Sequence, residues 1–298
     1  MDNATLIFDR LRPRLQGLAY RMLSSKAEAE ELVQDVWLRW HEADHAILDS
    51  AEAWLVTVTT RLSIDRLRAA KTQRLQYTGF WLPEPELDDS PATPEQELER
   101  ADDISVAFLL LLERLTPDAR AAFLLREVFD TDYAELARTL GKSEAACRQI
   151  VHRAKAQLRQ AGPSHVVSSQ VHFRLLSGFA EAARSGNLGA LQALLAEDAE
   201  LISDGGGKVA SFGKLLRGRA RIARLYFASW RRSELMQGWL SIVPAHINGR
   251  WGLLRFIGGE LESAQSYETD GLRIVRIHVQ RNPDKLKRLA AAWACKEG

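Results

Sequence analysis

The stretch TDYAELARTLGKSEAACRQIVHRAKAQLR, residues 131–159, predicts two short helices joined by a tight turn. Ala137 is small enough to let the helices approach, Gly141 can adopt a positive φ, and Ser143 can cap the second helix. Apolar residues continue at helical spacing on both sides of the turn, at Tyr133, Leu136, Leu140, Cys147, Ile150, Val151, Ala154 and Leu158. This combination indicates a helix-turn-helix.

The outward face of the second helix is polar and basic. Residues from which a helix in the major groove can reach base edges are Ser143, Glu144, Ala145, Arg148, Gln149 and His152. Arg153, Lys155 and Arg159 are placed for phosphate contacts. The face therefore predicts DNA binding, with an ordinary helical hairpin as the alternative.

Length and composition set the outer limits. A chain of 298 residues with 46% hydrophobic and 27% charged residues is typical of a globular protein of two or three domains. The longest apolar run, residues 106–112, is far shorter than the roughly 20 residues of a membrane helix. The N-terminus lacks a signal-peptide pattern, so a cytoplasmic location is expected. With only Cys147 and Cys295 and seven scattered histidines, we expect neither a disulfide framework nor a metal or cofactor site.

The net charge of +1 conceals an uneven distribution. Residues 76–105 contain one basic and nine acidic residues, whereas residues 163–298 contain 19 basic and 12 acidic residues. Opposite charges attract over roughly 10 Å at moderate salt. The pattern therefore predicts an intramolecular contact between these two segments.

Three helices are predicted in the first 75 residues, over 5–23, 27–43 and 51–71. Pro13 marks a kink or a helix start. The third helix carries a ridge suited to a phosphate backbone, formed by Arg61, Asp65, Arg66, Arg68, Lys71 and Arg74. A solvated charged face is the alternative for such a ridge.

Residues 5–160 resemble a bacterial extracytoplasmic-function (ECF) sigma factor. LVQDVW at 32–37 is similar to the region 2 helix that docks on the clamp helices of RNA polymerase, WLVTVTTRLSIDRLR at 54–68 is similar to the helix facing the -10 promoter element, and residues 115–159 resemble region 4, which reads the -35 element. Many relatives carry asparagine where this chain has Arg61, so a base preference is not carried over to that position.

The resemblance implies roles for particular residues. Contact with the β and β′ subunits of core polymerase falls on Gln34, Asp35, Trp37 and Arg39. Contact with the -10 element falls on Arg61, Asp65, Arg66, Arg68 and Lys71, and the loop 44–50 reads an extruded base. Contact with the -35 element falls on Ser143, Glu144, Arg148, Gln149, His152, Arg153 and Lys155.

Residues 76–105 are predicted to form a linker, because four prolines between positions 83 and 94 disfavour a helix, and their nine acidic residues make this linker acidic. A flexible tether does not need Phe80, Trp81 and Leu82, so this part is expected to dock on another surface. A local cover for the core of the first domain is the alternative. Helical pattern resumes afterwards, with a buried helix over 106–115 and a helix from 118 to 127 opened by Thr116 and Pro117.

Residues 163–298 predict an α+β domain. Helices are expected over 171–185, 188–195 and 218–230, and strands over 200–203, 238–247, 250–256, 263–269 and 272–279. Glycine-containing turns separate the later strands, at 248–249, 258–259 and 270–271. This order resembles the SnoaL-like fold, a curved sheet wrapped by helices around a conical pocket.

The whole chain resembles the ECF subgroup with a fused SnoaL-like extension. Its three hallmark motifs are WLPEP (Trp81, Leu82, Pro83, Glu84, Pro85), DGGGK (Asp204, Gly205, Gly206, Gly207, Lys208) and NPDKL (Asn282, Pro283, Asp284, Lys285, Leu286). The resemblance implies that the extension regulates the sigma factor in cis. We expect WLPEP and DGGGK, with NPDKL, to form that contact, Asp204 and Lys208 fixing the register through charge-assisted bonds.

The sequence therefore predicts two all-α domains, 1–75 and 106–162, joined by the linker 76–105 and followed by the α+β domain 163–298. Two alternatives stay open. The chain could be an ordinary DNA-binding regulator that works without polymerase. The SnoaL-like domain could sense a small ligand or act as an enzyme, using Asp204, His246 or His278 as acid or base, or the glycines 205–207 as an anion cradle. We expect no catalytic residues.

Overall fold

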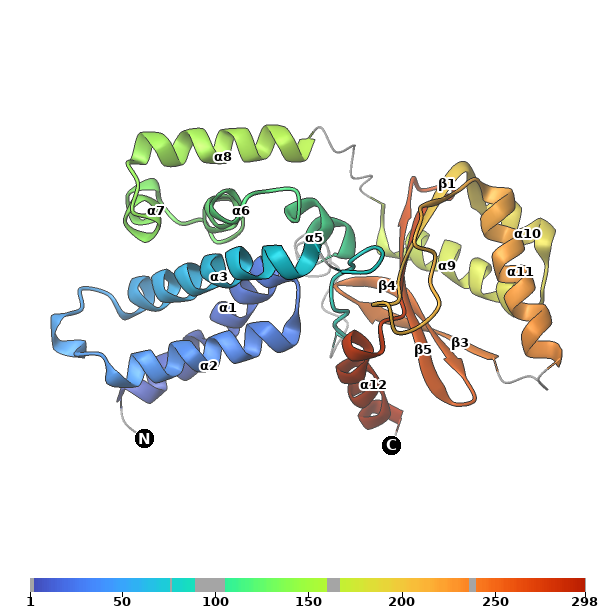
Figure 1. Ribbon diagram of the computed structural model, residues 1–298, viewed down its shortest axis with the longest axis horizontal. Helices are drawn as coiled ribbons and strands as arrows, with labels where there is room; N and C mark the ends of the chain where they lie inside the picture. Colours follow the sequence, from blue (N-terminus) through green and yellow to red (C-terminus); the bar gives the residue numbers. More distant parts are fainter. Residues whose placement is uncertain (1–2, 76, 89–104, 160–166, 236–239, 298) are drawn as a thin grey trace. The chain divides into compact units, whose positions relative to one another are not determined.

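The computed structural model describes residues 3–75, 77–88, 105–159, 167–235 and 240–297 (Figure 1). The chain forms two compact units. The first, a helical unit, contains residues 1–75 and 109–163, and the second, an α+β unit, contains residues 76–108 and 164–298. Within the described residues, no helix has the length and apolar character needed to cross a membrane.

The first part of the helical unit is a bundle of α1 (Asn3–Leu23), α2 (Lys26–Glu42) and α3 (Ala51–Leu75). The Ser25 hydroxyl accepts a hydrogen bond from Glu28 N and caps α2. Fully buried side chains from all three helices, among them Leu15, Leu32 and Leu55, form the core. The three predicted helices are confirmed, and Pro13 lies inside α1.

The second part of the helical unit contains the helix-turn-helix. Its elements are α6 (Pro117–Phe123), the π-helix η2 (Leu124–Val128), α7 (Tyr133–Leu140) and α8 (Glu144–Arg159), preceded by α5 (Val106–Leu112), which enters this unit at Leu109. Gly141 ends α7 with φ 64°, and the Ser143 hydroxyl accepts from Ala146 N at 3.2 Å. Leu136, Cys147 and Val151 are buried as predicted. The helix-turn-helix is therefore confirmed, down to its turn and its cap.

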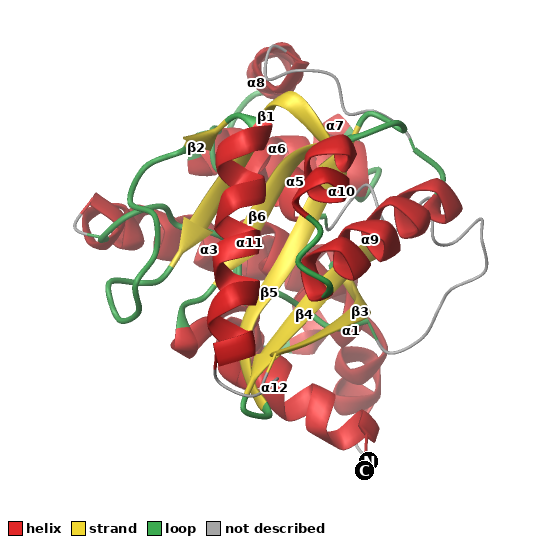
Figure 2. Cartoon of the chain, turned by 90° about the vertical axis from the view of Figure 1, so that its right-hand side faces the viewer, coloured by secondary structure: helices red, strands yellow, loops and turns green. Residues whose placement is uncertain are grey.

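The α+β unit is built on one six-stranded sheet in the order β2-β1-β6-β5-β4-β3 (Figure 2). The strands are β1 (Leu195–Asp204), β2 (Leu216–Arg217), β3 (Leu240–Ile247), β4 (Arg250–Ile257), β5 (Glu260–Thr269) and β6 (Ile274–Gln280). Strands β3 to β6 form an antiparallel meander, and β1 pairs with β6 in parallel. The predicted meander is confirmed, whereas β2 was not expected from the sequence.

Helices bury both faces of this sheet. The helices α9 (Ser169–Arg184), α10 (Leu188–Leu194) and α11 (Arg219–Leu235) cover one face, seen in front of the strands in Figure 2. The helix α12 (Pro283–Glu297) packs Leu286 and Leu289 on the other face, against Leu254 and Ala264. The helix α12 begins within the NPDKL motif and was not predicted from the sequence. Residues that alternate along a strand therefore lie in two different environments.

Candidate nucleic-acid interface and linker-docking site

The outward face of α8 is exposed along its length. Ser143, Glu144, Arg148, Gln149, His152 and Arg153 are all solvent-exposed. Arg148 Nη2 lies 2.8 Å from Glu144 Oε2, and its guanidinium stacks 4.7 Å above the Tyr133 ring. Lys155 is bound to Glu127 of η2 at 2.6 Å. The geometry leaves α8 open to a DNA groove, with Arg148 held over its N-terminal turn.

The predicted polymerase-binding residues of α2 divide between two faces. Gln34 and Trp37 line a groove of about 300 Å³ against Phe8 and Arg12 of α1, and the Trp37 ring packs 4.8 Å from that of Phe8. Asp35 instead pairs with Arg66 of α3 at 2.6 Å. Arg39 is exposed. Gln34 and Trp37 therefore line the same groove, whereas Asp35 forms an ion pair with Arg66.

Leu38 is an exposed residue of α2 that the sequence analysis missed. It is 60% exposed and follows Trp37 directly. The only signal in the sequence was that Leu38 is apolar but does not lie on the helix face of Leu32, Val36 and Trp40, which are buried. An exposed leucine beside an aromatic groove suits a protein contact.

Two predicted -10 residues are bound to the helix-turn-helix part of the same unit. Arg61 donates from Nε to Thr139 O at 3.0 Å and from Nη2 to Arg138 O at 3.1 Å. Arg68 Nη2 lies 2.8 Å from Asp118 Oδ2. The sequence predicted that both guanidinium groups contact DNA phosphates. In the structure, Arg61 binds carbonyls at the C-terminal end of α7, and Arg68 binds a carboxylate of α6.

The remaining -10 residues have other surroundings. Arg66 is held by Asp35, and Asp65 is exposed beside Arg68 at 3.7 Å. The side chain of Lys71 lies outside the described residues. In the loop 44–50, the short 3-10 helix η1 (His45–Ile47) ends with Ile47, whose side chain is 76% exposed. This loop has the exposure that a base-reading element needs.

In the α+β unit, Asp204 is a buried hydrogen-bond hub for the linker. Its Oδ1 accepts from the Tyr77 hydroxyl at 2.7 Å and from Gly206 N at 2.9 Å. Its Oδ2 accepts from Leu82 N at 2.9 Å and from Lys285 Nζ at 2.8 Å. The carboxylate is fully shielded from solvent. Burial and the hydrogen bond to Asp204 raise the pKa of Tyr77, which therefore stays a neutral donor.

Residues of β6 and α12 complete the linker-docking site around Leu82. Gln280 Nε2 donates to Leu82 O at 3.2 Å and Pro83 O at 3.1 Å, and Lys285 Nζ donates to Leu82 O at 2.7 Å. The Lys285 ammonium also lies 4.2 Å from the Trp81 ring centroid. Leu82, Pro83, Glu84 and Pro85 are buried. The structure thus brings WLPEP, DGGGK and NPDKL into one cluster.

The roles within this cluster differ from those that the sequence suggested. Lys285 partners Asp204, whereas Lys208 forms an ion pair with Asp284 on the surface. Asp284 therefore has a lowered pKa, chiefly through its hydrogen bond to Lys208. Tyr77 and Gln280 were not predicted, because both lie outside the three motifs.

The glycines of DGGGK provide space for the other two motifs. Gly206 has φ 62°, and a Cβ there would lie 2.3 Å from Asn282 Nδ2. Gly207 has φ 71°, and its Cβ would lie 3.2 Å from that of Thr78. Asn282 in turn donates to the Tyr77 hydroxyl at 2.9 Å. The glycines are therefore needed for close approach of chain segments.

A second anchor fixes the linker where it leaves the cluster. Glu86 N donates to Asn248 Oδ1 at 3.2 Å, and Asn248 N donates to Glu86 O at 2.9 Å. Gly249 N donates to Asp88 Oδ2 at 2.7 Å, and Leu87 forms a β-bridge with Ile247. The described linker residues 77–88 are thus bound at two places, to Asp204 at the end of β1 and to Ile247 and Asn248 at the end of β3.

The candidate acid–base residues do not converge. His278 lies on β6 and His246 on β3, with β5 and β4 between them. Asp204 is occupied by the linker. Burial lowers the pKa of His278 to about 4. His246 is therefore separated from His278 by two strands, whereas Asp204 and His278 lie on the paired strands β1 and β6, where Asp204 is registered with Gln280 and His278 with Ile202.

Comparison with known proteins places this geometry in a family. The Sigma-70 region 2 family model matches residues 7–73, and the Sigma-70, region 4 model matches residues 105–158. The ECF RNA polymerase sigma factor SigJ of Mycobacterium tuberculosis is 40% identical over 223 residues, covering 73% of this chain and 70% of the relative. The probable ECF sigma factor SigI of the same species is 28% identical, covering 94% and 93%.

A solved structure agrees over nearly the full length. The crystal structure of M. tuberculosis SigJ matches with a TM-score of 0.74 at 31% identity, covering 95% of this chain and 98% of that one. The chain belongs to the ECF RNA polymerase sigma factors. Its α+β unit is the SnoaL-like extension that the three motifs implied.

Proposed function

We propose that this sigma factor directs core polymerase to its promoters in the cytoplasm and that its SnoaL-like extension regulates it in cis by holding the linker. The observation that carries this proposal is the Asp204 hub, which binds the Leu82 amide at 2.9 Å and the Tyr77 hydroxyl at 2.7 Å. The hub ties the linker that joins the two promoter-binding regions.

The contacts within the helical unit support a closed resting state. Promoter elements at -10 and -35 lie about 25 base pairs apart, which is about 85 Å of B-DNA at roughly 3.4 Å per base pair. Regions 2 and 4 are joined here by direct hydrogen bonds from Arg61 to Thr139 O and Arg138 O. Both regions can occupy their elements together only after they separate.

Release of the linker is the step that the extension controls in this proposal. While residues 77–88 are docked, they cannot extend freely between the two regions. In this proposal, regions 2 and 4 separate fully only when the hydrogen bonds between the linker and Asp204 break. Weakening the hub should favour the open form and raise initiation.

We propose no catalytic role for the SnoaL-like extension. Asp204 accepts hydrogen bonds from the linker, and the unit contains a cavity of about 520 Å³ whose described lining residues include neither His246 nor His278. These three residues therefore give no support to acid–base catalysis by the extension.

Run-off transcription with purified core polymerase tests the proposal. We expect core-dependent initiation at a cognate promoter, and several-fold more of it with Asp204→Asn than with the wild type. Lys208→Met, which removes the exposed ion pair with Asp284, is the control and should behave like the wild type. Tight binding of promoter DNA without polymerase, together with no core-dependent initiation, would instead identify an ordinary DNA-binding regulator.

A further inference from the structure

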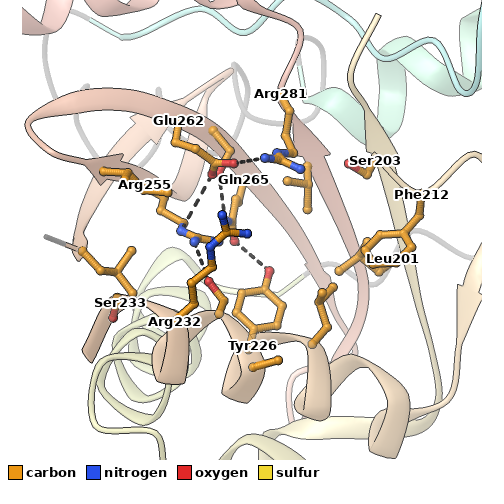
Figure 3. Close-up of a pocket in the computed structure, with 17 residues that line it drawn as sticks. Leu201, Ser203, Phe212, Tyr226, Arg232, Ser233, Arg255, Glu262, Gln265 and Arg281 are labelled. Atoms are coloured by element: carbon orange, nitrogen blue, oxygen red, sulfur yellow. Dashed lines mark hydrogen bonds and ion pairs between the residues drawn. The ribbon is translucent and has the colours of Figure 1, made fainter. Parts of the chain in front are cut away.

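The SnoaL-like extension contains a cavity of about 520 Å³ between α11 and the sheet (Figure 3). Its lining residues come from β1, α11, β3, β4, β5 and β6, together with Phe212 and Arg281. Cavities of ~300–1,000 Å³ hold drug-sized ligands. Neither the promoter-binding residues nor the linker motifs occupy this space, so its lining needs a separate explanation.

The charged residues of the lining are mainly basic. Arg232, Arg255 and Arg281 face the cavity with a single carboxylate, Glu262, as Figure 3 shows. Arg281 forms an ion pair with Glu262, and Arg255 binds the Ser229 hydroxyl. Three guanidinium groups against one carboxylate leave an excess of positive charge in a half-enclosed site. Such a site favours an anion.

Two buried polar atoms in this cluster lack hydrogen-bond partners among the described residues. They are Arg255 Nε and Glu262 Oε2, which form an ion pair with each other at 3.7 Å, a distance too long for a hydrogen bond. An unsatisfied buried polar group is destabilising. A ligand oxygen that accepts from Arg255 Nε would relieve this, and a ligand hydroxyl could donate to Glu262 Oε2.

Two buried tyrosine hydroxyls, one from Tyr226 of the lining and one from its neighbour Tyr267, already have an acceptor. The hydroxyls of Tyr226 and Tyr267 both donate to Gln265 Oε1, at 2.8 Å and 2.6 Å. Burial raises the pKa of both tyrosines, so both remain protonated. The guanidinium groups, together with serine hydroxyls of the lining, are the donors that can bind the polar end of a ligand.

Seven further residues of the lining are apolar. They are Leu201, Phe212, Leu225, Ala228, Leu240, Ile257 and Val279. Phe212 and Ile257 remain 42% and 38% exposed. Covering such surface with a hydrocarbon group is favourable, by about 25 cal/mol per Å². A ligand for this cavity therefore combines an apolar body with an anionic head.

The cavity and the linker-docking site lie on opposite sides of the same two strand ends. Leu201 and Ser203 of β1 face the cavity, whereas Asp204 binds the linker. Similarly, Arg281 lines the cavity, whereas Gln280 binds Leu82 O. Arg281 N also donates to Asp204 O at 2.7 Å. A shift of Arg281 in the cavity therefore moves the backbone that positions the Asp204 hub.

We propose that this cavity binds a small organic anion with an apolar body, its head on Arg232 and Arg255, and that occupancy of the cavity alters the hold on the linker. The binding site rests on the cavity alone. The effect on the linker rests on the proposed regulatory function of the hub, and the two parts are tested by separate measurements.

Calorimetric titration of the full chain tests the binding site. Sodium decanoate is the probe, decyl phosphate tests a second anionic head, and decyltrimethylammonium is the cationic control, all below their micellar concentrations. We expect saturable one-to-one binding of decanoate or decyl phosphate. Arg232→Met, on an exposed position of α11, should weaken it at least tenfold, and so should Arg255→Met. Arg224→Met, an exposed arginine of α11 outside the lining, should leave affinity unchanged.

Three results would overturn the binding site: no saturable binding of either anion, equal binding of the cation, or wild-type affinity in Arg232→Met. Hydrogen exchange of the peptide containing Leu82 then tests the second part without any transcription assay. We expect the exchange rate of this peptide to change at least threefold when the anion is bound. Unchanged exchange at saturation would remove the coupling and leave the binding site in place.

Discussion

Lys285 Nζ lies 2.8 Å from Asp204 Oδ2, and the carboxylate of this pair is completely shielded from solvent. Asp204→Asn removes the charge but retains the shape of the side chain. Breaking a buried ion pair on one side costs about 3–5 kcal/mol, because the other charge stays buried. We expect a loss of this size in the free energy of unfolding of the α+β unit, measured by urea denaturation of the full chain.

The exposed pair of Lys208 and Asp284 is the matched control for that experiment, since it joins the same two motifs. Its side chains are 55% and 49% exposed. Surface pairs contribute about 0–1 kcal/mol, so Lys208→Met should hardly change stability. Equal losses for Asp204→Asn and Lys208→Met would contradict the hub assignment.

Gly206→Ala should displace the NPDKL motif from DGGGK. The added Cβ would lie 2.3 Å from Asn282 Nδ2, and the residue would keep a positive φ of 62° that alanine disfavours. We expect a loss of stability of roughly 1–3 kcal/mol and faster hydrogen exchange across residues 77–88. Gly213→Ala, where a Cβ meets nothing within 4 Å, is the control. Similar exchange in both variants would refute the packing role of Gly206.

Asp118→Asn should release Arg68 from its 2.8 Å contact with α6 and so loosen regions 2 and 4. The substitution removes no proposed DNA contact, so we expect promoter complexes of the holoenzyme to form faster. Asp130→Asn is the control for the lost negative charge, because Asp130 belongs to the same region and is 95% exposed in its pair with Arg126. If both substitutions accelerate binding equally, general attraction to DNA is the cause.

Arg148→Ala should relax base preference within the -35 element. A bidentate contact between arginine and guanine contributes about 1–3 kcal/mol of discrimination, which the variant loses on cognate DNA only. Arg153→Ala is the comparison, because an exposed arginine on phosphate weakens all sequences alike and lowers the salt slope by nearly one unit. Lys155 is less suitable, since Glu127 binds it at 2.6 Å. Matching losses on cognate and scrambled promoters would remove Arg148 as a base reader.

Acid should destabilise the α+β unit through two buried histidines. Burial lowers the pKa of His172 and of His278 from 6.5 to about 4. As pH falls, the two histidines are protonated near pH 6.5 in the unfolded chain but only near pH 4 in the folded chain. The folded state is therefore fully stable above pH 6.5 and loses stability as pH falls toward 4. Each histidine contributes a slope of about 1.4 kcal/mol per pH unit in this window.

His278→Gln should reduce that slope by the share of one histidine, as measured by denaturation at several pH values. A slope that is the same in His278→Gln and in the wild type would contradict the buried neutral state of His278.

Local sequence rules predicted the helical unit well. A glycine with positive φ, a serine cap and buried residues at helical spacing were sufficient for the helix-turn-helix, because each acts within a few residues. The antiparallel meander followed from its turn dipeptides. The helix α12 was missed because its start at Pro283 fell inside a sequence that was interpreted only as a motif.

Partners distant in sequence were harder to predict. The charge balance predicted a contact between the acidic linker and the basic extension, but it did not indicate the contacting groups, which include the Leu82 backbone, Tyr77 and the second anchor at Glu86 and Asp88. Likewise, nothing local to Arg61 indicates that α7 accepts its hydrogen bonds. Both cases depend on tertiary packing, which brings together residues that are 77 or more positions apart.

The fit of Gly206 against Asn282 has an evolutionary consequence. A side chain at position 206 would take the space of the asparagine, and loss of the asparagine would remove a bond to Tyr77. Selection should therefore act on three distant stretches of the gene as though they were one. Among relatives, drift in any one of these stretches should be accompanied by drift in the other two, even where the helix-turn-helix is unchanged.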